Sequence, residues 1–317
     1  MALVESSPGL SPDCRPESAA ELASVTKLHP PREGVFNPGV KSYAQGSTAL
    51  RGEEIDWTLT VPENLAYDGL AVIVNGYTGI AQSSQAPREA HADNGVATLS
   101  FSPARFGANW LESVTNPQRV HAIAIKKVLS DARQDETVRK LFKREELEEG
   151  KLLLVPHSMG GLGASRFAET EAGSTDAIIN LASVGFGHPT FRELIADIPK
   201  GSLPGVWHEL IPSLIGGEIE ASRRNIHDLR HYITKHRYPF EGLSCLLEDS
   251  RPRTARLREL GVFVAYQAYE KDILVRADDR VAEHVDHHEV MKNAGHLAPI
   301  RKAHAVAGRV RAILEAR

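Results

Sequence analysis

The sequence has 317 residues, of which 42% are hydrophobic and 25% charged, a balance typical of a folded globular protein rather than a disordered or fibrous chain. Its formal net charge of −4 gives no electrostatic reason to expect nucleic acid or an anionic membrane as a partner. No run reaches the roughly 18 apolar residues of a membrane span, and neither a secretory signal nor a disulfide framework is indicated, so we expect a cytoplasmic protein with two reduced cysteines, Cys14 and Cys245.

The order of the predicted elements is that of an alternating α/β chain. Residues 1–41 are rich in Pro, Ser and Glu and are predicted to form a flexible N-terminal extension. From residue 42 onward, short apolar runs alternate with segments of helical periodicity, which predicts a mostly parallel sheet flanked by helices. Strands are predicted at Glu54–Pro62, Leu70–Tyr77, Val96–Phe101, Lys151–His157, Asp176–Ser183 and Val262–Tyr269, and helices at Asn116–Arg133, at Ser158–Thr170 and from Pro299 onward.

One segment, residues 185–250, interrupts this alternation, because it holds several helical pieces and no clear strand. We interpret it as a helical cap inserted into a core whose two parts are residues 42–184 and 251–317. Two charged stretches, Val138–Lys151 and Ser222–Arg237, are interpreted as solvated helix surfaces. The alternative for the second stretch is that its basic charges guide an anionic substrate, such as an acyl chain carried on a phosphopantetheine arm.

A serine stands between a buried strand and a pair of glycines in the string Pro156-His157-Ser158-Met159-Gly160-Gly161. A sharp turn from a strand into a helix exposes such a hydroxyl and directs the next backbone N–H at a reacting carbonyl oxygen. The turn crowds the backbone, so small residues must follow the serine. The simpler interpretation is that Ser158 only caps the following helix.

The string "PHSMGG" resembles the "GHSMGG" nucleophile turn of α/β-hydrolase-fold serine hydrolases, with Pro156 in place of the first glycine. The resemblance covers residues 42–317 and is weakest in the predicted cap. It implies an α/β-hydrolase fold in which Ser158 is the nucleophile and the Met159 N–H is one oxyanion donor. It also implies a second donor after an early strand, and Asn75-Gly76 at that place assigns it to the Tyr77 backbone N–H.

The same resemblance implies an acid after a late strand and a histidine before the last helix, in the chain order Ser, acid, His. Gly295-His296 precedes the terminal helix, so His296 is the implied general base. Asp272 matches the acid best, with Glu270, Asp278 and Asp279 as competitors.

These residues imply a serine hydrolase that cleaves a carboxylic ester or a related small acyl compound through an acyl-enzyme on Ser158, without a cofactor. Apolar cap residues are candidate walls of the substrate pocket, or they pack the cap onto the core: Leu203, Trp207 and Ile211. One alternative is a thioesterase or acyltransferase whose partner is an acyl carrier. Another is a non-catalytic binding member of the fold. The oligomeric state is left open.

Two groups of histidines have spacings that could bind a metal ion, but the surrounding sequence favours neither as a metal site. His227 and His231 stand four residues apart, but the apolar stripe of the same predicted helix places them on its polar face. The second group, His284, His287 and His288 near Asp286, has no cysteine neighbour and no metal-binding motif. We therefore expect no metal.

Overall fold

Strands from both parts of the predicted core form one sheet in the residues that the structure, a computed structural model, describes. Those residues are 41–50, 53–76, 84–101, 116–144, 152–186, 248–272, 275 and 279–317. Across the sheet the strand order is β1-β2-β4-β3-β5-β6-β7-β8. The strands are β1 (Lys41–Leu50), β2 (Glu53–Pro62), β3 (Tyr67–Val74), β4 (Val96–Phe101), β5 (Leu152–Pro156), β6 (Thr175–Leu181), β7 (Phe263–Tyr269) and β8 (His287–Met291).

The sheet is mostly parallel, which confirms the predicted fold class. Strand β1 pairs antiparallel with β2, and β2 pairs antiparallel with β4. All pairings from β4 through β3, β5, β6 and β7 to β8 are parallel. Parallel neighbours need long crossover connections, and the helices between the strands supply several of them.

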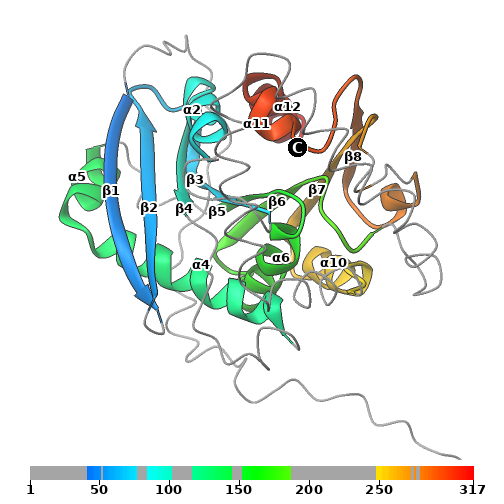
Figure 1. The fold of residues 1–317 in the computed structure, drawn as a ribbon, viewed down its shortest axis with the longest axis horizontal. Coiled ribbons are helices and arrows are strands. Elements are labelled where there is room, and N and C mark those ends of the chain that lie inside the picture. Colours follow the sequence, from blue (N-terminus) through cyan, green and yellow to red (C-terminus); the bar gives the residue numbers. More distant parts are fainter. Residues whose placement is uncertain are drawn as a thin grey trace, which may run out of the picture.

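Helices cover both faces of this sheet (Figure 1). One layer packs on the larger apolar cluster and the other packs on a second cluster beneath the C-terminal helix. The first layer contains α4 (Pro117–Gln134), α5 (Glu136–Arg144), α6 (Gly160–Thr170) and α10 (Arg251–Glu259), and the second contains α2 (Gln85–Asp93), α11 (Ala298–Arg301) and α12 (Ala303–Glu315).

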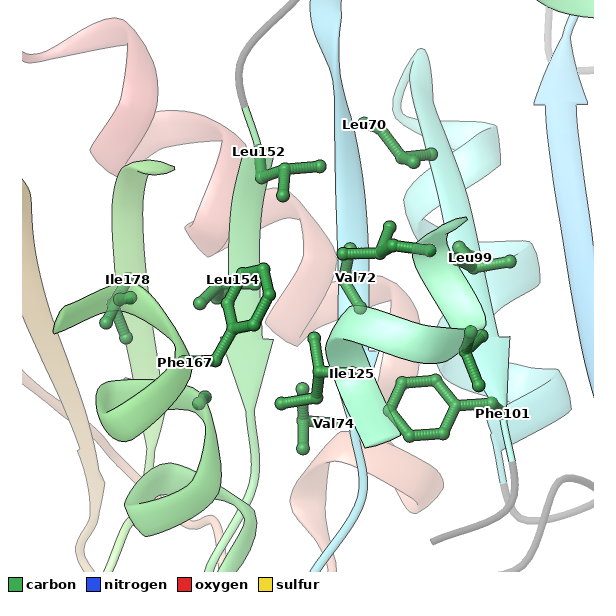
Figure 2. Close-up of a cluster of buried hydrophobic side chains, with 14 of the residues drawn as sticks. Leu70, Val72, Val74, Leu99, Phe101, Ile125, Leu152, Leu154, Phe167 and Ile178 are labelled. Atoms are coloured by element: carbon green, nitrogen blue, oxygen red, sulfur yellow. The ribbon is translucent and has the colours of Figure 1, made fainter. Parts of the chain in front are cut away.

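The central strands are apolar on both faces because both faces are buried, as their nearly unbroken apolar sequences predict. Figure 2 shows leucine and valine side chains of β3, β4 and β5 directed toward Ile125 of α4 and Phe167 of α6. Burying each such side chain stabilises the fold by about 1.5–3 kcal/mol. This layer fixes where α6 begins, and therefore where Ser158 lies.

Several features differ from the sequence-based expectation, and helices α2 and α10 are not among the predicted helices. Strands β1 and β8 are not predicted, because both are short of apolar residues and lie at the two edges of the sheet. The stretch predicted as a solvated helix end contains most of α5, which buries Val138, Leu141 and Phe142 against the core. The terminal helix is interrupted at Lys302, which separates α11 from α12.

The ends of the predicted cap lie side by side. The Ser250 N–H donates to the Gly185 carbonyl oxygen at 2.9 Å, and the Ser250 hydroxyl contacts the Val184 carbonyl oxygen at 3.4 Å. Residues 187–247 are outside the described residues, so the helical cap remains a prediction. Among the helices that the structure does describe, none is both long and apolar enough to cross a bilayer.

Buried histidines should make the stability of the fold depend on pH. Burial lowers the pKa of His91 and of His121 from 6.5 to about 4. The unfolded chain therefore binds more protons than the folded chain between pH 6.5 and 4, and stability is lost as the pH falls through that window. The loss is about 2 kcal/mol per histidine by pH 5.

Urea unfolding at pH 7 and pH 5 measures this effect. The His91→Leu variant should lose less of its free energy of unfolding over that interval than the wild type does. An equal loss in both proteins would show that His91 is not neutral in the folded state.

Candidate active site

The candidate catalytic residues follow strands that end at the same edge of the sheet. Ser158 lies just beyond β5, Asp272 just beyond β7 and His296 beyond β8. Because parallel strands place their C-terminal ends together, these residues follow the same edge of the sheet although they are far apart in the sequence.

Ser158 occupies the tip of a tight turn between β5 and α6. Its φ is 55°, in the left-handed region that is uncommon for a residue with a side chain. Two backbone hydrogen bonds, one to the end of β6 and one to a residue just after β6, stabilise this conformation. The Ser158 N–H donates to the Leu181 carbonyl oxygen at 3.0 Å, and the Ser158 carbonyl oxygen accepts from Val184 N–H at 3.3 Å.

The two glycines after Met159 are required by close packing. A Cβ at Gly160 would lie 2.4 Å from the Val74 carbonyl oxygen, and one at Gly161 would lie 2.5 Å from the Ser183 hydroxyl oxygen. Pro156, which departs from the family pattern, is the last residue of β5 and pairs with Val74. A proline at that position fits the extended backbone of the strand end.

One described backbone group near Ser158, the Met159 N–H, suits the stabilisation of an oxyanion. The Met159 N–H has no backbone acceptor within the described part of the chain, and it lies at the N-terminus of α6, where the helix dipole favours negative charge. Gly76 is close enough that a Cβ there would lie 3.0 Å from Ser158 Cβ. The Asn75 side chain points elsewhere, toward Ser84 and the Phe101 carbonyl oxygen. Tyr77, the second predicted donor, is outside the described residues.

Asp272 and His296 form a buried pair. Asp272 Oδ2 is 2.7 Å from His296 Nδ1, and Asp272 Oδ1 accepts from the Val275 N–H at 2.8 Å. A carboxylate oxygen accepts, so Nδ1 carries the proton and Nε2 is the basic nitrogen of the neutral ring. This is the tautomer that a general base toward a serine hydroxyl requires.

The competing carboxylates are placed differently. Glu270 Oε2 accepts from the Asn293 N–H at 2.8 Å and is directed to the surface, and Asp279 is exposed in a 3₁₀ turn, η4 (Asp279–Glu283). Asp278 is outside the described residues.

His157 is a contact of His296 that the sequence pattern does not single out. Its Nε2 lies 2.8 Å from the His296 carbonyl oxygen, and the two ring centroids are 4.7 Å apart. Removal from water, with a smaller effect of His296, lowers the pKa of His157 from 6.5 to about 3. The signal available in the sequence was a polar residue between a buried strand and the serine.

No protein-family model and no curated protein sequence matches this chain. Solved structures do match it. An epoxide hydrolase from Vigna radiata aligns over 87% of this chain and 98% of its own at 11% identity, with a TM-score of 0.59. A thermophilic esterase from Thermogutta terrifontis aligns over 87% and 98% at 17% identity, with a TM-score of 0.55. A thioesterase domain from the curacin biosynthetic pathway aligns over 85% and 99% at 16% identity, with a TM-score of 0.54.

The chain has the α/β-hydrolase fold. In this fold the nucleophile is expected at a strand-to-helix turn, and Ser158 occupies such a turn between β5 and α6. At the identities found, the likeness shows the fold and not the reaction, so the chemistry must be argued from the residues.

Several other predicted residues lie outside the part of the chain that the structure describes. Leu203, Trp207 and Ile211 are outside the described residues, as are His227 and His231. Within the described ranges, no group of three or more His, Cys, Asp and Glu side chains is arranged to hold a metal ion. Asp286, near the second histidine group, instead pairs with Arg258 at 2.7 Å.

Proposed function

We propose that this α/β-hydrolase is a serine hydrolase that cleaves a carboxylic ester or a related small acyl compound. The observation that carries the proposal is a positive-φ serine at the start of α6 whose preceding residue, His157, contacts the buried Asp272–His296 pair. Backbone strain of this kind is concentrated at functional sites, so the conformation of Ser158 supports a functional role.

The reaction begins with proton transfer from the Ser158 hydroxyl to His296 Nε2 as Ser158 Oγ attacks the acyl carbon. Asp272 holds the ring in the required tautomer and stabilises the imidazolium that forms. The imidazolium then gives its proton to the leaving alkoxide, and the acyl group remains on Ser158. Water, deprotonated by His296, attacks that ester, and the acid and free serine are released.

The negative charge on the carbonyl oxygen needs donors that are already in place. We assign this role to the backbone N–H groups of Met159 and Tyr77. Backbone donors at a helix N-terminus keep their orientation during the reaction, and loss of one such donor typically costs about 10²–10³-fold in rate. Leu203, Trp207 and Ile211 are proposed to line the acyl pocket.

A thioesterase or acyltransferase acting on a carrier-bound acyl group is the second candidate, supported by the structural likeness to a thioesterase domain. The same serine attack would cleave either an ester or a thioester. Hydrolysis of p-nitrophenyl esters and of acyl thioesters, measured side by side on one preparation, separates the two candidates.

A fluorophosphonate probe tests the shared mechanism without knowledge of the substrate. We expect one covalent adduct, located on Ser158 by peptide mass spectrometry, and no adduct in the Ser158→Ala variant. A folded wild-type protein that stays unlabelled would overturn the proposal and favour a non-catalytic binding role.

A further inference from the structure

The residue before the nucleophile also contacts the general base. His157 is held at the end of β5, where its N–H donates to the Val74 carbonyl oxygen at 3.0 Å. Its side chain reaches residue 296, which is 139 positions away in the sequence, and its Nε2 lies 2.8 Å from the carbonyl oxygen there. A carbonyl oxygen can only accept, so Nε2 of His157 is the donor in this hydrogen bond.

The protonation of His157 suits a fixed donor. Removal from water lowers the pKa of this imidazole to about 3, so the ring is neutral at the pH at which serine hydrolases work. With its pKa lowered to about 3, the His157 ring is a much weaker base than an ordinary imidazole. It therefore holds its partner without competing with His296 for the proton of Ser158.

Contacts with Asp272 and His157 restrain the base. His296 is bonded through Nδ1 to Asp272 at 2.7 Å and through its carbonyl oxygen to His157, and its ring lies against the His157 ring at 4.7 Å with 41° between the planes. The Asp272 contact fixes which way the ring faces. The His157 contact fixes the distance between the backbone segment that carries His296 and the turn that carries Ser158.

We infer that His157 is a positioning residue, which ties the backbone of His296 to the residue next to Ser158 and so sets the approach of base to nucleophile. This inference rests on the proposed function. A catalytic group misplaced by about 1 Å can lower the rate by about 10²-fold. A hydrogen bond that sets the distance between His296 and the Ser158 turn should therefore have a large effect on the rate.

Two substitutions at His157 distinguish the effect of its hydrogen-bond donor from the effect of its aromatic ring. His157→Phe keeps an aromatic ring, slightly larger than imidazole, but removes the donor, and His157→Gln keeps an N–H at the position of Nε2. We expect His157→Phe to lower kcat for ester hydrolysis by about tenfold or more with KM changed by less than about twofold, and to slow fluorophosphonate labelling to the same degree. His157→Gln should recover labelling to within about threefold of the wild-type rate.

His121→Phe is the matched control, because removal from water also lowers the pKa of His121, to about 4, but this residue belongs to α4 and packs against Gly163 of α6. This control should label at the wild-type rate. Equal labelling of His157→Phe and wild type would overturn the inference and leave the proposed function intact. Equal loss in His157→Phe and His157→Gln, with both folded, would also overturn it, since the donor would then not be what matters. Failure of the wild type to label would overturn the proposed function and this inference together.

Discussion

Ser158→Ala should reduce ester hydrolysis by about 10⁴-fold or more while the protein stays folded. The substitution removes only the hydroxyl group. The hydrogen bonds that hold the turn use the Ser158 backbone N–H and carbonyl oxygen, which alanine retains. Circular dichroism and thermal unfolding of the same preparation would show that the fold is kept. Residual activity within tenfold of the wild type would contradict a Ser158 nucleophile.

A second variant at the same position tests the geometry of the turn. Ser158→Gly also lacks the hydroxyl, but glycine adopts a φ of 55° without steric cost, whereas alanine does not. We therefore expect the free energy of unfolding of Ser158→Gly to exceed that of Ser158→Ala by about 1 kcal/mol. Denaturant titration of the two variants measures this difference. Greater stability of the alanine variant would show that this position is not strained.

Asp272→Asn should lower kcat by about 10³–10⁴-fold. Asp272 Oδ1 accepts the Val275 N–H, and an asparagine that keeps this bond must present its NH₂ group to His296 Nδ1. Nδ1 would then have to accept, which moves the ring proton to Nε2. A ring protonated at Nε2 cannot take the proton of Ser158, so the base is lost without any loss of side-chain volume.

Glu270→Gln is the control for this substitution, since it makes the same change from carboxylate to amide in the same loop. The Glu270 carboxylate accepts from the Asn293 N–H at the surface, and a glutamine oxygen can accept that bond equally well. We expect kcat of this variant to stay within about twofold of the wild type. Similar losses in the two variants would mean that Asp272 is not the acid of the proposed mechanism.

The sequence was most informative where the local structure is set by residues that are close together in the sequence. The central strands could be predicted because a strand buried on both faces is apolar throughout, as β3, β5 and β6 are. The turn at Ser158 could be predicted because the glycines that it requires follow within three positions. Edge strands β1 and β8 escaped prediction, since a strand with one exposed side carries few apolar residues.

The sequence by itself determined the alternating α/β pattern, the serine turn and a short set of carboxylates after β7, because each of these is set by residues close together in the chain. Only the tertiary structure placed Asp272 rather than Glu270 against His296, and only it brought His157 to the His296 carbonyl oxygen. Those contacts join residues 24 and 139 positions apart, and they exist because the parallel sheet gathers the C-terminal ends of its strands at one edge. A local sequence pattern does not indicate which side chain, distant in the sequence, will contact a given residue.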